Sequence, residues 1–351
     1  MFRLHRVLCS AMILVLSVTP LAAQRARSRV VIGESLVDNK DPQPGQLNSP
    51  FGVDFDAAGN MYIVELGGGR VHKLDAAGTF STIAGDGSKS YRGDGGPAAK
   101  ATFNGMHNVA VTPQGDVYIA DSWNHCIRKI DGKSGMINTI AGTGTPGFSG
   151  DAGPAIQAMF NYLMCVSLNP TNDALYVADL KNRRIRRIDL KTNIVSTVAG
   201  NGKKGVPQDG SPATESPLID PRAVAVDSLN NIYVLERSGN ALRVVDSDGR
   251  IKTVVGTGER GTQVGAALET QLGSPKHLAI DAQNNVIIAD EANRRILKYE
   301  PNKKQVSILL GKGVGKPNRG LSRPHGVYVH RDGTIYIVDT GHHRILSLKF
   351  R

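Results

Sequence analysis

FNGMHNVAVTPQGDVYIADSWNHCIRKIDGKSGMINTIAG, residues 103–142, holds four short apolar runs separated by turn residues. Each run has the length and the β-branched side chains of a β-strand. Each break between runs contains the Gly, Asn, Asp or Pro that a tight turn requires. The stretch therefore predicts four short strands joined by turns, with the strands at 108–111, 117–120, 127–130 and 137–141.

The same pattern recurs along the chain, and self-similarity at this spacing indicates a repeat architecture. The first strand of each unit has large apolar side chains on one face and mostly small ones on the other, as expected of an inner strand in a propeller blade. The chain contains 40 glycines and 17 prolines, and no long apolar pattern of helical period occurs after residue 24. Both features argue against a helical or coiled-coil fold. The six units begin near residues 47, 103, 160, 218, 272 and 321.

The sixth unit has no fourth strand, because the chain stops at Arg351. Residues 29–33, RVVIG, carry the missing pattern at the other end of the sequence. We predict that this N-terminal strand completes the last blade, closes the ring and covers an otherwise bare sheet edge.

The second strand of every unit ends in an acid, and four of the six units place an arginine five residues later. A carboxylate at a turn can accept backbone N–H bonds and a guanidinium, so we interpret this ring of acids as structural rather than catalytic. The acids are Glu65, Asp121, Asp179, Glu236, Asp290 and Asp339, and the arginines are Arg70, Arg184, Arg295 and Arg344.

Three segments that follow a second strand, DLKNRRI at 179–185, DEANRRI at 290–296 and DTGHHRI at 339–345, resemble NHL repeats. The resemblance covers roughly residues 29–350. It implies an all-β fold, a six-bladed β-propeller of four-stranded antiparallel blades, with residues 24–351 as one domain. It does not imply a single function, because one fold supports many.

Residues 1–23 read as a secretory signal peptide, with a basic start, an apolar run at 7–18 and small residues before Gln24. The apolar run is shorter than the ~20 residues that span a bilayer, which favours a cleaved signal over a retained membrane anchor. We therefore expect an exported protein, periplasmic or extracellular, with no membrane span after cleavage. We also expect a monomer.

Removal of the signal takes away Arg3 and Arg6, which lowers the formal net charge from +11 to +9. So basic a chain favours anionic surroundings such as cell-wall polymers or acidic polysaccharide. Nucleic acid is not expected as a partner of an exported protein.

Cys126 and Cys165 lie at non-equivalent strand positions, so we predict two buried thiols rather than a disulfide.

Three of the connections between units share an Asp-x-Gly/Ser-Pro-Ala signature, beginning at Asp94, Asp151 and Asp209. We predict a capped turn followed by one helical turn at each of them, because Pro suits the first position of a helix. One Asp in each loop is too few for a Ca²⁺ site, which takes ~6–8 oxygen ligands.

The residues just before the inner strands should surround one mouth of the central channel, and a pocket there is the default binding site. We predict ligand-binding residues at Phe51, His107, Met164, Arg222, Lys276 and His325.

Peptide-amidating lyase, an enzyme built on similar repeats, has three zinc-binding histidines at this position in alternate blades. The corresponding residues of this chain are His107, Arg222 and His325. Since arginine is not a zinc ligand, the resemblance does not extend to a three-histidine site. Three alternatives stay open: a divalent metal on His107 and His325 with a carboxylate, a general base beside an anion-binding Arg222, or a channel lining without catalysis. The motifs of gluconolactonase-like propellers and of virginiamycin-type lyases are not matched.

The densest positive run is a further candidate site for an anionic partner. Its alternative interpretation is a solvated, partly salt-bridged face. The run consists of Lys181, Arg183, Arg184, Arg186 and Arg187.

Taken together, the sequence favours an exported propeller that binds a protein, glycan or cell-wall ligand, or acts as a scaffold. The alternative is a metal-assisted lyase or lactone hydrolase with its catalytic residues, His107, Arg222 and His325, at the channel mouth.

Overall fold

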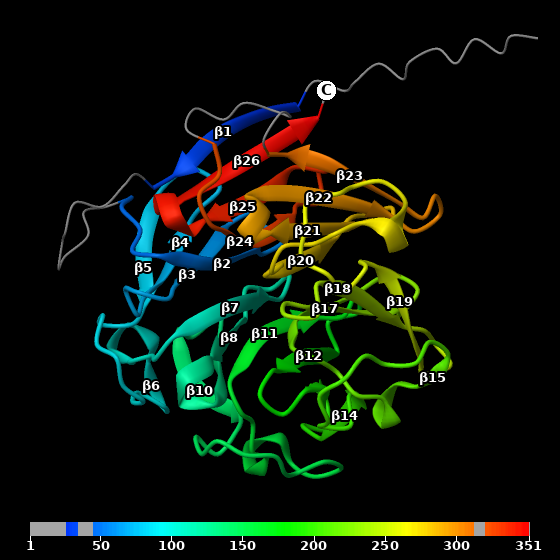
Figure 1. The fold of residues 1–351 in the computed structure, drawn as a ribbon. Helices are drawn as coiled ribbons and strands as arrows, with labels where there is room; N and C mark the ends of the chain where they lie inside the picture. Colours follow the sequence, from blue (N-terminus) through cyan, green and yellow to red (C-terminus); the bar gives the residue numbers. More distant parts are fainter. Residues whose placement is uncertain (1–25, 34–44, 312–319, 351) are drawn as a thin grey trace, which may run out of the picture.

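The computed structural model describes residues 26–33, 45–311 and 320–350. Its strands form six separate antiparallel sheets arranged in a ring, with the inner strands around the centre (Figure 1). This confirms the predicted six-bladed β-propeller. The predicted signal peptide, residues 1–23, lies outside the described residues. In the part of the chain that the structure describes, no helix is long and apolar enough to cross a membrane.

Each blade consists of four strands, which follow one another from the channel outwards. Blade 1 contains β2 (Pro50–Phe55), β3 (Met61–Glu65), β4 (Val71–Leu74) and β5 (Phe80–Ala84). Blade 2 contains β7 (Met106–Val111), β8 (Val117–Asp121), β9 (Cys126–Ile130) and β10 (Met136–Ala141). Blade 3 contains β11 (Leu163–Leu168), β12 (Ala174–Asp179), β13 (Arg184–Asp189) and β14 (Val195–Ala199).

The second half of the ring repeats this order. Blade 4 contains β16 (Pro221–Val226), β17 (Ile232–Glu236), β18 (Ala241–Val245) and β19 (Arg250–Val255). Blade 5 contains β20 (His277–Ile280), β21 (Val286–Asp290), β22 (Arg295–Glu300) and β23 (Gln305–Leu310). Blade 6 contains β24 (Pro324–Val329), β25 (Ile335–Asp339), β26 (Arg344–Phe350) and β1 (Ala26–Ile32). Two-residue strands β6 (Gly96–Pro97) and β15 (Ser211–Pro212) extend blades 2 and 4.

The ring closes as predicted, because β1 from the N-terminus is the outer strand of the last blade. It runs antiparallel to β26, from the pair Ala26–Phe350 to the pair Ile32–Ile345, and the two lie side by side in Figure 1. Val31 and Ile32 pack against the cluster of apolar side chains between blades 6 and 1. Similar clusters fill the other contacts between blades, so burial of apolar surface holds the ring together.

The predicted helical turns are present after the Pro-Ala signatures, as single 3₁₀ turns η1 (Ala98–Lys100), η3 (Ala155–Gln157) and η4 (Ala213–Glu215). The predicted caps were wrong, because each proline occupies the N-cap position rather than the first helical one and no side chain caps any of the three turns. The aspartates of these loops bind the sheet that follows. Asp94 pairs with Arg128 at 2.7 Å, Asp151 pairs with Arg186 at 2.8 Å, and Asp209 accepts hydrogen bonds from Thr253. Cys126 and Cys165 are free and buried, as predicted.

The corner acids have the predicted structural role, but with partly different partners. All six are fully buried, and each accepts a backbone N–H from a loop residue 16 to 18 positions earlier, as Asp179 does from Asn161 at 2.8 Å. Arg295 and Arg344 pair with their corner acids at 2.6 and 3.0 Å, which confirms the prediction for blades 5 and 6.

The predicted partners Arg70 and Arg184 were wrong. In blades 1 to 4 the carboxylate pairs with the residue seven positions after it, not five. Residues five and seven positions on lie on the same face of the third strand, and the more distant one takes the carboxylate where it is basic. In blades 5 and 6 that position is a leucine, so the nearer arginine pairs instead. The partners seven positions on are His72, Arg128, Arg186 and Arg243.

Candidate functional site

A line of hydrogen bonds crosses the middle of the channel. The Val166 N–H donates to Asn108 Oδ1 at 2.9 Å, and Asn108 Nδ2 donates to His277 Nε2 at 2.9 Å. His277 Nδ1 in turn donates to the Val327 carbonyl at 3.1 Å. Burial, reinforced by nearby Arg222, lowers the pKa of His277 to about 4, so the ring is neutral and accepts from Asn108. Asn108 and His277 thus connect the opposite blades 2 and 5 across the channel.

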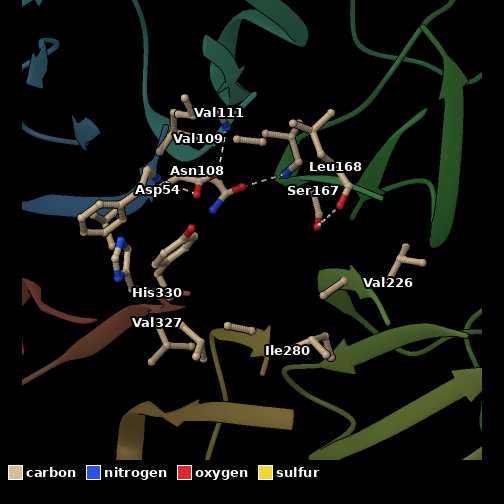
Figure 2. Close-up of a pocket in the computed structure, with 18 of the residues that line it drawn as sticks. Asp54, Asn108, Val109, Val111, Ser167, Leu168, Val226, Ile280, Val327 and His330 are labelled. Atoms are coloured by element: carbon tan, nitrogen blue, oxygen red, sulfur yellow. Dashed lines mark hydrogen bonds between the residues drawn. The ribbon is translucent and has the colours of Figure 1, made fainter. Parts of the chain in front are cut away.

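One end of the channel is hollow. A cavity of about 440 Å³ is lined by all six inner strands (Figure 2), and this volume falls in the range of small-ligand sites. The hollow follows from the third residue of each predicted inner-strand pattern, which is small in four of the six blades. These residues are Asp54, Ala110, Ser167, Ala225, Ala279 and Tyr328. We call this cavity the channel pocket.

The polar side of the channel pocket is formed by blades 6, 1 and 2. Asp54 accepts hydrogen bonds from the backbone N–H groups of Phe55 and Val111, both at 2.7 Å, and from the Tyr328 side chain. Burial raises the pKa of Asp54 from 3.8 to about 7 despite these hydrogen bonds. His330 lies at the rim with its ring centroid 5.1 Å from that of Phe55.

The opposite side of the channel pocket is apolar and comes mainly from blades 3 to 5. Figure 2 shows Leu168, Val226 and Ile280 across the cavity from Asp54. An apolar wall facing a few fixed polar groups is typical of sites for small molecules. Among the described residues, no group of three or more His, Cys, Asp or Glu side chains is placed to hold a metal ion.

The six predicted ligand-binding residues lie at the other end of the channel, and none of them lines the channel pocket. Phe51 is at their centre. Its ring stacks on His325 at 4.1 Å, meets His107 edge-on at 4.9 Å, and lies 5.8 Å from the Arg222 guanidinium. Arg222 Nη1 donates to the Met164 carbonyl at 3.2 Å, and Lys276 pairs with Glu291 at 4.0 Å. We call this group the mouth cluster.

Burial controls the charges in the mouth cluster. It lowers the pKa of His107 to about 3 and that of His325 to about 2, with Arg222 adding to both effects. Both imidazoles are therefore neutral at physiological pH. Burial also lowers the pKa of Lys276 to about 8 and that of Arg222 to about 10. The structure thus brings His107, Arg222 and His325 together around one phenyl ring.

An aromatic pair stands beside the mouth cluster. Trp123 Nε1 donates to the Tyr162 hydroxyl at 2.8 Å, and the His107 ring centroid lies 6.0 Å from each of the two rings. Trp123 belongs to the turn η2 (Ser122–Asn124) and is 36% exposed. Blade 2 therefore places both His107 and an accessible tryptophan at this end of the channel.

The predicted basic patch is not one surface. Arg186 is fully buried between Asp151 and Asp179, and Arg184 stacks on Phe148 at 3.7 Å. Strand alternation sends Arg187 to the opposite face, where it pairs with Asp189 at 3.1 Å. Lys181 is exposed and Arg183 is half-buried. The five basic side chains are thus divided among a buried ion pair, a stacking contact and two faces of the blade.

The sequence predictions did not include the polar residues of the channel pocket. The inner strands contain a pattern that could have predicted these residues. Their third residue is alanine in three blades, but it is Asp54 in blade 1, Ser167 in blade 3 and Tyr328 in blade 6. Such a departure from the repeat marks asymmetry, which a binding site needs and a scaffold does not. Asn108 and His277 depart in the same way from the small residues at the first inner-strand position.

Known protein families and curated relatives that match this chain also contain NHL repeats. The NHL repeat model matches residues 103–130 and 321–346, and the teneurin NHL domain model matches residues 155–264. The NHL repeat-containing protein 2 of Gallus gallus is 26% identical over 357 residues, covering 90% of this chain. The chain spans 48% of the length of that relative.

Solved structures share the fold at low identity. An auxiliary nutrient binding protein from Bacteroides thetaiotaomicron VPI-5482 has a TM-score of 0.68 at 13% identity, covering 93% of this chain and 77% of that chain. Virginiamycin B lyase from Staphylococcus aureus has a TM-score of 0.54 at 14% identity, covering 93% and 99%. Propellers of this architecture thus occur among proteins named for binding and among proteins named as enzymes.

Proposed function

Because this chain is an NHL-repeat β-propeller, we propose that it is an exported binding module whose channel pocket holds a small ligand or one end of a glycan, peptide or cell-wall polymer. The observation that carries the proposal is the cavity of about 440 Å³ lined by all six inner strands. A ligand there would contact every blade, and its specificity would come from the asymmetric residues Asp54, Ser167 and Tyr328.

The chemistry of the channel pocket favours an uncharged ligand with hydroxyl or amide groups and one apolar face. Asp54 already accepts three hydrogen bonds, and its pKa of about 7 leaves it partly protonated at neutral pH. It therefore offers little attraction to a cation. The apolar side chains of blades 3 to 5 match the carbon face of a sugar ring or an apolar side chain. The nutrient-binding propeller that shares this fold supports the same class of function.

Export rests on residues 1–23, whose basic start and short apolar run suit a cleaved signal peptide. The proposed partners are accordingly components of the cell envelope or of the surrounding medium. N-terminal sequencing of the protein recovered outside the cytoplasm would identify a cleavage after residue 23.

Filling the channel pocket should weaken ligand binding. We expect Ala279→Phe, on the apolar wall, to weaken any ligand found on a glycan and peptide array by at least about tenfold, because the ring occupies the space that the ligand needs. Isothermal titration calorimetry with the best array ligand measures the effect. Ala99→Phe is the matched control, since Ala99 is exposed on η1 away from the cavity. Equal affinity in the two variants would show that the ligand binds elsewhere.

A metal-assisted lyase or lactone hydrolase is the second candidate, because His107 and His325 both contact the ring of Phe51 with Arg222 nearby. The donor set does not fit a metal. Arg222 repels cations, and the described residues contain no group of three ligating side chains. If this end is catalytic, the chain's own residues suit proton transfer by a neutral histidine beside a cationic Arg222 better than Lewis-acid chemistry.

Metal analysis of the purified protein tests the metal version directly. We expect well under one divalent ion per chain, with no change in His107→Ala or His325→Ala, because two buried neutral imidazoles without a carboxylate make a weak site. The measurement is elemental analysis after dialysis against the candidate metals. Stoichiometric metal that disappears in both variants would instead show a metal site on these histidines, which the enzyme alternative requires.

A further inference from the structure

The mouth cluster contains a buried positive charge that has no ion-pair partner among the described residues. Arg222 is 3% exposed, and its Nη1 donates to the Met164 carbonyl. Its Nε is buried without a partner, and no carboxylate of the described residues 26–33, 45–311 and 320–350 forms an ion pair with it. A buried guanidinium in this state is unfavourable unless something compensates its charge.

The surroundings increase this imbalance. Three further cations lie close enough to the mouth cluster for their positive charge to lower the pKa of His107, of His325 or of both. They are Lys276, Arg237 and Arg323. Two carboxylates stand nearby and both are engaged: Asp220 accepts from Arg237 at 2.8 Å and from Ser238 at 2.6 Å, and Glu291 accepts from Arg323 at 3.3 Å. Four cations thus face two carboxylates, an excess of two positive charges.

A second unsatisfied group points to the same place. His325 is 4% exposed, and its Nδ1 is buried without a hydrogen-bond partner. The neutral imidazole can donate from this nitrogen, so the cluster holds both unused donors and unbalanced charge. Native proteins rarely leave such groups unsatisfied, and a bound ligand is one of the ordinary reasons for it.

We propose that the mouth cluster is an anion-binding site that takes the carboxylate, sulfate or phosphate group of a ligand, with Arg222 as its principal counter-ion. The ligand body would lie against the accessible ring of Trp123, which is hydrogen-bonded to Tyr162 at 2.8 Å. No residue of the mouth cluster lines the channel pocket, so we expect the two sites to bind their ligands independently.

The test titrates D-glucuronate, inorganic phosphate and D-glucose at constant ionic strength, read by calorimetry and by thermal shift. We expect saturable binding of at least one of the two anions and none of glucose. Arg222→Met should weaken anion binding by at least about tenfold, which is the effect of losing a charged hydrogen bond. The variant should fold, because methionine fills the volume without a buried charge.

Three comparisons separate the outcomes. Arg187→Met, which removes a surface arginine paired with Asp189, should bind the anions as the unaltered protein does. Trp123→Ala should weaken glucuronate more than phosphate if the ligand is a carboxylated sugar, and should leave both affinities unchanged if the site takes a free oxyanion. Ala279→Phe, which fills the channel pocket, should leave anion binding unchanged. Unaltered affinity in Arg222→Met, or no saturable binding of either anion, would overturn the proposal.

Discussion

Deletion of residues 26–32 should lower the Tm by about 10 °C or more, because it removes β1 and reopens the ring. β1 makes the outer edge of blade 6 and packs the partly buried Val31 and Ile32 against the side chains between blades 6 and 1. Full burial of one such side chain contributes ~1.5–3 kcal/mol, so each of these contributes less than that, and the lost backbone hydrogen bonds add to this. The deletion also exposes the edge of β26, so we expect association that increases with protein concentration.

Thermal unfolding and size-exclusion chromatography at several concentrations measure both effects. A matched pair of substitutions in β1 separates the contribution of apolar side-chain burial from that of the backbone hydrogen bonds to β26. Val31→Ser should lower stability by about 1–3 kcal/mol, whereas Val30→Ser, at a side chain that is 49% exposed, should change it by no more than about 0.5 kcal/mol. An intact, monomeric protein with an unchanged Tm after deletion would show that closure by β1 contributes little.

The fold could be predicted from the sequence because its information is local and repeated. A strand of four to six residues and a turn with Gly, Asn or Asp are recognisable within one unit, and recurrence in register removes the ambiguity of any single unit. Ring closure was predictable for the same reason. The last unit lacks a strand, and residues 29–33 have its pattern.

The sites were less predictable, because they depend on how six distant segments combine. The structure gathers residues of the mouth cluster around Phe51, but the sequence does not show that Phe51 stacks on His325. The channel pocket depends on the sum of side-chain volumes from all six blades. The corner pairs failed for a related reason: Arg184 and Arg186 share a face of β13, and the choice between them depends on Asp151, which a separate loop brings to Arg186.

The second large loss of stability is expected from removing the buried Arg186. Arg186→Ala should destabilise the protein by about 3–5 kcal/mol, because it leaves the buried carboxylate of Asp179 without its cation. Arg186 is fully buried, 2.8 Å from Asp151 and 3.6 Å from Asp179, and it also lies against the rings of Phe148 and Phe160. Arg187→Ala is the matched control on the same strand. Its ion pair with Asp189 is partly exposed, so we expect a loss of no more than about 1 kcal/mol.

The loss of unfolding free energy in Arg186→Ala should depend on pH, because the Asp179 carboxyl group titrates. Burial raises the pKa of Asp179 from 3.8 to about 6, so the folded protein binds this proton more tightly than the unfolded chain does. The contribution of Asp179 to stability therefore falls as the pH rises through this window. Without Arg186 the folded pKa rises further, because the ionised form loses its partner. We expect a smaller loss at pH 5 than at pH 8 by urea denaturation, and an equal loss at both would mean that Asp179 is not the group that Arg186 neutralises.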